Sequence, residues 1–256
     1  MRMAGLLEVC ADSVCSAVNA ARGGADRIEL CSALPLGGLS PDEDLFCMVR
    51  ERVDIPVRVL LRPRAGDFLY DEDEFELLCR QASRFAGLGA DGIVIGMLNP
   101  DGTLDTERMS TLMACGDGCG VTLHRAFDVC RDAHEALRTA KKLGVDTILT
   151  SGQQARCADG APLLRELVSE SGEGLRILIG GGVNADVIRA LAPQTGADAF
   201  HLSAKAAVPS GMEFRRENVP MGIPGLNEFE LWRCDEGAVR AAREALDAVC
   251  TARKEN

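Results

Sequence analysis

Two short segments of the chain each carry a glutamate and a cysteine two positions apart. The pairs are Glu8 with Cys10 and Glu29 with Cys31. Side chains two apart on a β-strand face the same side, so each segment offers a carboxylate and a thiol on one face. Carboxylates transfer protons, and thiolates bind soft metal ions such as Cu(I). Reduced cysteines that merely fill the core are the alternative, but a glutamate is rarely buried without a partner, which favours a functional face.

Two arginines flank a proline directly after a third apolar segment. They are Arg62 and Arg64, and a Gly-Asp pair follows them. Guanidinium groups bind carboxylates and phosphates through paired hydrogen bonds. We therefore expect these arginines to bind an anion or to pair with Glu8 and Glu29. A surface turn is the alternative, and it is less favoured because Arg62 lies two residues after an apolar strand position.

The chain contains three histidines, His124, His134 and His201. His124 and His201 lie at the predicted carboxyl ends of strands, whereas His134 falls on a predicted helix and is expected on the surface. A histidine at a strand end can be a general acid or base, or a structural hydrogen-bonding group. The functional interpretation is favoured for His124 but not for His201. Asp128, four residues after His124, is a further catalytic candidate.

A repeated pattern predicts the elements that must position these residues. Four times, a glycine, a small residue and an aspartate lead straight into a short apolar run. Each glycine can close a preceding helix in a left-handed conformation, and each run is short enough for a buried strand. Four such quarters give eight strands, which predicts an α/β fold of the closed (β/α)8 TIM type with functional residues at the carboxyl ends of the strands. The repeats begin at Gly24, Gly89, Gly144 and Gly196.

The expected elements occupy one domain over residues 1–256. Helix starts are read from capping residues, with Ser40 as the cap of the second helix and Pro41 at its first position. A loop-rich segment over 209–234 precedes a final helix over 236–253. The predicted strands are 6–10, 27–31, 57–61, 92–96, 121–124, 147–150, 176–180 and 199–202.

The predicted strand ends also offer an anion site. Glycines between a strand and a helix N-terminus let backbone N–H groups approach an anion, and the loops after strands 7 and 8 of such barrels often bind phosphate. A tight turn without a ligand is the alternative. The anion-binding candidates are Ser151, Gly180, Gly181, Gly182, Ser203 and Lys205.

Composition excludes several classes of protein. The net charge of −11 argues against a nucleic-acid partner, which needs a basic surface. No long apolar stretch or signal-peptide pattern is visible, so we expect no membrane association and a cytoplasmic location. The eleven cysteines show irregular spacing and no Cys-x-x-Cys pair, so most are expected to be reduced core residues. A homodimer is compatible with this surface.

The chain resembles the CutC family, named for copper homeostasis. The resemblance implies a barrel fold, a cytoplasmic location and copper binding, with Cys10 and Cys31 at the positions of the family's proposed ligands. Departures from the family pattern are Leu36 for a glutamate, Ala65 and Gln153 for glycines, and Leu123 for a phenylalanine. The matching runs are 8–13, 23–32, 37–41, 62–68, 124–128, 149–152, 180–183 and 211–215.

Two functions therefore stay open. The first is a copper-handling protein that holds Cu(I) between Cys10 and Cys31. The second is an enzyme, a lyase, isomerase or hydrolase, that acts on a small anionic, phosphorylated or sugar-like substrate. In that case Glu8, Glu29 and His124 would transfer protons and the arginines would hold charge. A purely structural or partner-binding barrel is the least favoured alternative, because an unused ring of buried polar groups costs stability.

Overall fold

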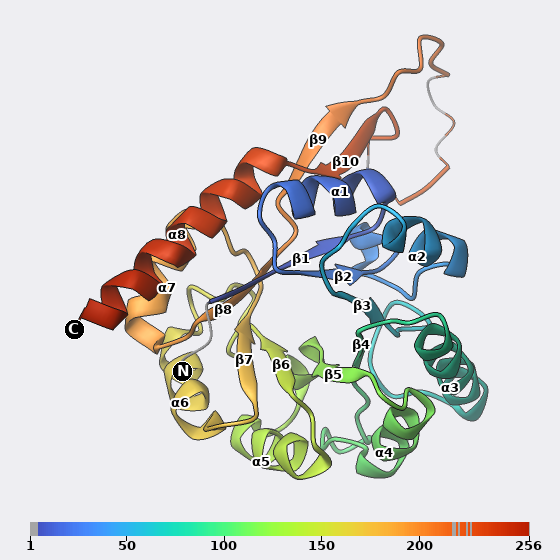
Figure 1. Cartoon of the computed structure of the whole chain (residues 1–256). Coiled ribbons are helices and arrows are strands. Elements are labelled where there is room, and N and C mark those ends of the chain that lie inside the picture. Colours follow the sequence, from blue (N-terminus) through green and yellow to red (C-terminus); the bar gives the residue numbers. More distant parts are fainter. Residues whose placement is uncertain (1–4, 217–218, 220, 224, 226, 256) are drawn as a thin grey trace.

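Eight parallel strands close into a barrel in the order of the sequence (Figure 1). The computed structural model describes residues 5–216, 219, 221–223, 225 and 227–255. The (β/α)8 fold predicted from the glycine-aspartate repeats is confirmed. The barrel strands are β1 Leu6–Ala11, β2 Arg27–Leu30, β3 Val57–Leu60, β4 Gly92–Ile95, β5 Gly120–Leu123, β6 Thr147–Thr150, β7 Arg176–Ile179 and β8 Ala199–Leu202.

The helices surround the barrel, as Figure 1 shows. Two short 3-10 helices, η1 and η2, lie in the loops after β2 and β5. Their bounds are η1 Leu34–Leu36 and η2 Arg125–Val129. The α-helices are α1 Val14–Arg22, α2 Glu43–Arg50, α3 Glu72–Gly87, α4 Thr106–Cys115, α5 Ala133–Leu143, α6 Ala161–Ser171, α7 Ala185–Thr195 and α8 Glu236–Glu255. Within the described residues, none of these helices is both long and apolar enough to cross a membrane.

The repeated Gly-x-Asp pattern has a direct structural cause. Each of the four glycines has a positive φ, between +78° and +94°, which lets the chain leave a helix without the strain that a side chain would cause. Three of the aspartates then accept a hydrogen bond from the backbone N–H at or near the start of the preceding strand. Asp26 accepts from Leu7 at 2.7 Å, and Asp146 accepts from Val121 at 2.7 Å. The repeat therefore fixes the start of one strand against the next.

Aspartate side chains cap the starts of α3 and α2, and the cap predicted for the second helix is wrong. Asp71 forms a capping box at the start of α3, in which its side chain accepts from the N–H of Glu74. At α2 the cap is Asp42, whose carboxylate accepts from the N–H of Asp44. The predicted cap, Ser40, instead accepts from the backbone N–H of Arg62 at 2.9 Å, so its hydroxyl links two loops.

The loop-rich segment over 209–234 contains structure that the sequence did not indicate. Strands β9 (Lys205–Pro209) and β10 (Glu230–Cys234) pair antiparallel and project from the barrel beside α1 (Figure 1). Residues 217, 218, 220, 224 and 226 of this segment lie outside the described residues. The final helix, α8, extends to Glu255, two residues past the predicted end.

The interior of the barrel combines apolar and polar layers. The strand side chains that point out of the barrel pack against the helices and form the main hydrophobic core. Inside the barrel, a separate apolar cluster consists of Leu6, Leu149, Leu178 and Ala199. A second small cluster contains Cys31, Leu60 and Val94. Buried charged side chains from β1 and β2 also lie inside the barrel, and they form the candidate site.

Candidate functional site

A buried group of charged side chains joins strands β8, β1 and β2. Glu8 is paired in register with Arg27 on one side and with His201 on the other. Its Oε2 accepts a hydrogen bond from Arg27 Nε at 2.5 Å, and its Oε1 lies 2.8 Å from His201 Nδ1. The Glu8 side chain is fully buried. We name Glu8, Arg27 and His201 the ion triad.

The charges of the ion triad reinforce one another. Burial alone would raise the pKa of Glu8, but the charges and hydrogen bonds of Arg27 and His201 outweigh it and lower the pKa to about 2. Burial alone would lower the pKa of His201, but Cys10, Glu29 and Glu8 hold it well above its usual value. At neutral pH we therefore expect an ionised Glu8 between two cations.

Glu29 lies beside the triad on β2, opposite Cys10 in the register. It is 6% exposed, and its Oε2 has no hydrogen-bond partner among the described residues. Burial raises the pKa of Glu29 to about 7, the charge of His201 opposes that rise, and the charge of Glu8 adds to it. One ligand atom each of Glu8, Glu29 and His201 lie within 4.8 Å of one another, although Glu8 and His201 are already bonded together.

The two predicted metal ligands lie at the carboxyl ends of neighbouring strands. Cys10 is 7% exposed and Cys31 is fully buried, and neither forms a disulfide. Cys10 Sγ lies 3.8 Å from Leu202 O and also interacts with the His201 ring, and Cys31 Sγ lies 3.6 Å from Ala11 O. Burial, together with the charges of Cys10, Glu29 and Asp12, raises the pKa of the Cys31 thiol well above its usual value.

The two arginines after β3 are separated from each other and from the ion triad. Arg62 is buried and donates to the carbonyl oxygens of Leu36, Gly38 and Gly66 at 2.9–3.1 Å. The expected pairing of Arg62 and Arg64 with the two glutamates is wrong: Arg27 pairs with Glu8 from the neighbouring strand, and among the described residues neither arginine forms an ion pair with Glu29.

Arg64 lies in the exposed part of the same loop. Its Nε bonds Glu74 Oε1 at 2.5 Å and its Nη2 bonds Asp67 Oδ1 at 3.1 Å. Its side chain is 38% exposed, and the carboxylates of Asp67 in the loop and Glu74 on α3 neutralise its charge. Arg64 therefore does not join the residues inside the barrel.

His124 follows β5 and caps η2, where its Nδ1 accepts a hydrogen bond from the N–H of Ala126 at 3.1 Å. It is 5% exposed, and its ring packs against Phe68 with 4.8 Å between the ring centroids. Burial lowers the pKa of His124 to about 3, and the charge of Arg62 acts in the same direction. His134 lies on α5 beside Glu166 and Glu170, as expected of a surface residue.

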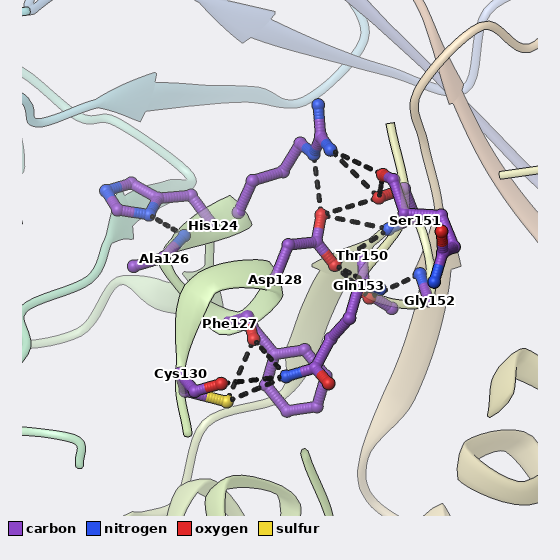
Figure 2. A network of polar contacts seen from close by, with 11 residues as sticks. His124, Ala126, Phe127, Asp128, Cys130, Thr150, Ser151, Gly152 and Gln153 are labelled. Atoms are coloured by element: carbon purple, nitrogen blue, oxygen red, sulfur yellow. Dashed lines mark hydrogen bonds and ion pairs between the residues drawn. The ribbon is translucent and has the colours of Figure 1, made fainter. Parts of the chain in front are cut away.

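Asp128 and Ser151 belong to a network that joins η2 to the loop after β6 (Figure 2). The Asp128 carboxylate accepts from Thr150 Oγ1 at 2.5 Å, from the Ser151 N–H at 3.0 Å and from the Gln153 N–H at 3.2 Å. It also pairs with Arg125 Nε at 2.6 Å. Because both carboxylate oxygens of Asp128 accept hydrogen bonds, this residue holds η2 and the loop after β6 together. We assign Asp128 the role of positioning these two loops.

The remaining anion-binding candidates are spread over two places. The Gly180–Gly182 turn follows β7 and is tied to the loop after β6, since Gly181 O accepts from the N–H of Cys157 at 2.9 Å. Ser203 follows β8. Lys205 begins the hairpin, is exposed, and lies over the Trp232 ring with 4.8 Å to the centroid. The Lys205 ammonium group therefore contacts Trp232 of the neighbouring hairpin strand.

A cavity of about 720 Å³ lies at the opposite, amino-terminal end of the barrel. Its charged lining includes Arg27, Arg58, Asp146 and Arg176. Arg58 holds Asp146 through two hydrogen bonds at 2.7 and 3.1 Å, so much of this charge is already paired. In (β/α)8 barrels this end usually serves stability rather than catalysis.

Sequence reasoning missed Arg27 and did not favour a functional role for His201. Arg27 shares the inward face of β2 with Glu29, so strict alternation along that strand could have indicated it. His201 is adjacent to Glu8 only because the barrel closes β8 against β1. The signal for His201 was its position at the end of the eighth strand, combined with closure.

Comparison with known proteins agrees with this architecture. The family model described as "CutC family" matches residues 5–206. A family protein CutC from Bacteroides fragilis is 45% identical over 227 residues, 88% of this chain and 90% of the relative. The human copper homeostasis protein cutC homolog is 44% identical and covers 92% of this chain and 86% of its own length. The crystal structure of CutC from Streptococcus agalactiae superposes with a TM-score of 0.73 at 27% identity, over 78% of this chain and 98% of that one. The chain therefore belongs to the CutC family.

Proposed function

We propose that the chain is a cytoplasmic copper-handling protein that binds Cu(I) as its cargo through the thiols of Cys10 and Cys31. Two observations support the proposal. Relatives at 44% identity carry a copper homeostasis name, and the chain retains two unpaired thiols at the carboxyl ends of adjacent barrel strands. The observation that carries most weight is this placement of two soft ligands inside a closed barrel.

The chemistry of the two thiols fits a monovalent soft ion. Thiolate sulfur is the ligand type that selects Cu(I). Cys31 Sγ makes a long contact with a carbonyl oxygen, whereas Cys10 Sγ also contacts the His201 ring, and metal binding would replace that contact. Cys10 and Cys31 are almost completely buried, which keeps water and oxidants away from a bound ion. Carboxylates are poor ligands for Cu(I), so Glu29 would balance the positive charges of Arg27 and His201 rather than bind the metal.

An anaerobic Cu(I) titration against a competing chelator tests the proposal. The variant is Cys10→Ser/Cys31→Ser, and the matched control is Cys47→Ser/Cys250→Ser, which removes two partly buried thiols on the outer helices. We expect the first variant to lose the tightest Cu(I) equivalent and the control to keep it. Equal stoichiometry and affinity in both variants would eliminate this site.

A second candidate function is proton transfer on a small anionic, phosphorylated or sugar-like substrate. It is favoured by Glu29, whose unpartnered Oε2 leaves a buried acceptor free inside the barrel. Native mass spectrometry of the purified protein tests this candidate. A bound organic anion that is lost in Glu29→Gln would support it, and a protein free of small molecules would count against it.

A further inference from the structure

The protonation of His124 is fixed by its own loop. His124 Nδ1 accepts the N–H of Ala126, as Figure 2 shows, so Nδ1 carries no proton. The ring proton of the neutral imidazole must therefore be on Nε2. Burial and the nearby Arg62 charge keep the pKa of the ring far below neutrality. His124 is thus an N–H donor at Nε2 and cannot act as a general base through Nδ1.

Two buried donors near each other have no acceptor. His124 Nε2 and Arg62 Nε both lack a hydrogen-bond partner among the described residues, while His124 is 5% exposed and Arg62 is 9% exposed. Both Nη atoms of Arg62 donate to backbone carbonyls, Nη1 to Leu36 and Gly38 and Nη2 to Gly66, which fixes the guanidinium in place. Native proteins rarely leave buried donors unpaired, and each such group calls for an explanation.

Phe68 connects these two donors. Its ring lies 4.8 Å from the His124 ring, centroid to centroid, and 5.2 Å from the Arg62 guanidinium carbon. Gly96 on the neighbouring strand end leaves the room that His124 fills, because a Cβ there would lie 2.5 Å from His124 Cε1. The two donors are therefore held in fixed positions at the carboxyl ends of β3 and β5, under the partly buried Phe68 ring.

We propose that Arg62 Nε and His124 Nε2 together bind an oxyanion, the carboxylate or phosphate of a small molecule, after the Phe68 ring moves aside. A positive guanidinium and a neutral N–H donor both favour an acceptor oxygen, and an arginine beside a donor suits either anion. The site uses neither Cys10 nor Cys31, so it goes beyond the copper proposal. It also names the substrate group for the second candidate function.

Histidine NMR tests the proposal directly, because the chain has only three histidines. In protein labelled with ¹⁵N-histidine, we expect His124 as the neutral Nε2–H tautomer. Sodium orthophosphate and sodium formate are then titrated separately, with sodium chloride at matched ionic strength as a control. We expect a saturable shift of the His124 Nε2 resonance with at least one of the two anions, and none with chloride. The more potent anion identifies the oxyanion class.

Three variants complete the test. Arg62→Gln should weaken the response at least tenfold, whereas Arg64→Gln, two residues away in the same loop, should leave it unchanged. His124→Asn keeps an acceptor for the Ala126 N–H but lacks the Nε2 donor, and calorimetry should show at least tenfold weaker binding of the same anion. Retained binding in Cys10→Ser/Cys31→Ser would separate this site from the copper site. A His124 ring protonated on Nδ1, or no saturable shift with either anion, would overturn the proposal.

Discussion

Replacing Glu8 by glutamine should be among the most destabilising single changes in the barrel. Glu8 is fully buried and bonds Arg27 and His201 at the same time. Glutamine has a similar shape but no charge, so it removes the carboxylate that Arg27 and His201 both contact directly. Removing one partner of a buried ion pair typically costs about 3–5 kcal/mol.

The pKa of Glu8 gives an independent magnitude and a pH dependence. Lowering the pKa from 4.5 to about 2 corresponds to about 3 kcal/mol in favour of the folded state with Glu8 ionised. Because the folded pKa is the lower one, this stabilisation is fully present above the unfolded value of 4.5 and is lost as the pH falls towards 2. The free energy of unfolding should therefore drop in this acid range in the natural protein, and less steeply in Glu8→Gln.

Urea denaturation followed by circular dichroism at pH 7 measures the effect. We expect Glu8→Gln to lose about 3 kcal/mol of unfolding free energy. The control Glu76→Gln removes an exposed carboxylate paired with Arg80, and it should cost less than about 0.5 kcal/mol. The double variant Glu8→Gln/Arg27→Met should recover part of the loss, since it also removes one unpaired cation. A Glu8→Gln loss no larger than that of the control would refute the ion triad as described.

Three further changes probe the elements that hold the site. Asp128→Ala removes the acceptor of several loop hydrogen bonds, so amide exchange at Ser151 should quicken markedly; unchanged exchange would contradict the bracing role. Gly96→Ala places a methyl group 2.5 Å from His124 Cε1, and thermal unfolding should show a loss of about 1–3 kcal/mol rather than no change. Asp42→Ala should lower the free energy of unfolding in urea by about 1 kcal/mol, as expected for a lost helix cap, and an unchanged free energy would show that Asp42 does not cap α2.

Much of the fold could be predicted because its signals are local. A glycine that closes a helix recurs in each quarter, an aspartate that accepts from the preceding strand recurs in three of them, and the strand bounds follow to within one residue. The hairpin of β9 and β10 was missed because its sequence is rich in turn-forming residues and its strands are largely exposed. Local pattern could not show that two distant segments pair antiparallel.

The candidate site was predictable only in part. Alternation correctly placed Glu8 and Glu29 on the inner face, since one strand decides that face by itself. The partner of Glu8 depends on register between strands, and alternation along one strand does not supply it. The role of His124 depends on which ring nitrogen its loop engages, and residue type alone does not determine that choice.

Copper K-edge X-ray absorption on the protein loaded anaerobically with one equivalent of Cu(I) shows whether Cys10 and Cys31 hold the metal. We expect sulfur scatterers around a monovalent copper, lost in Cys10→Ser/Cys31→Ser and kept in Cys47→Ser/Cys250→Ser. A copper shell made of nitrogen and oxygen alone, or a sulfur shell that persists unchanged in Cys10→Ser/Cys31→Ser, would contradict this expectation.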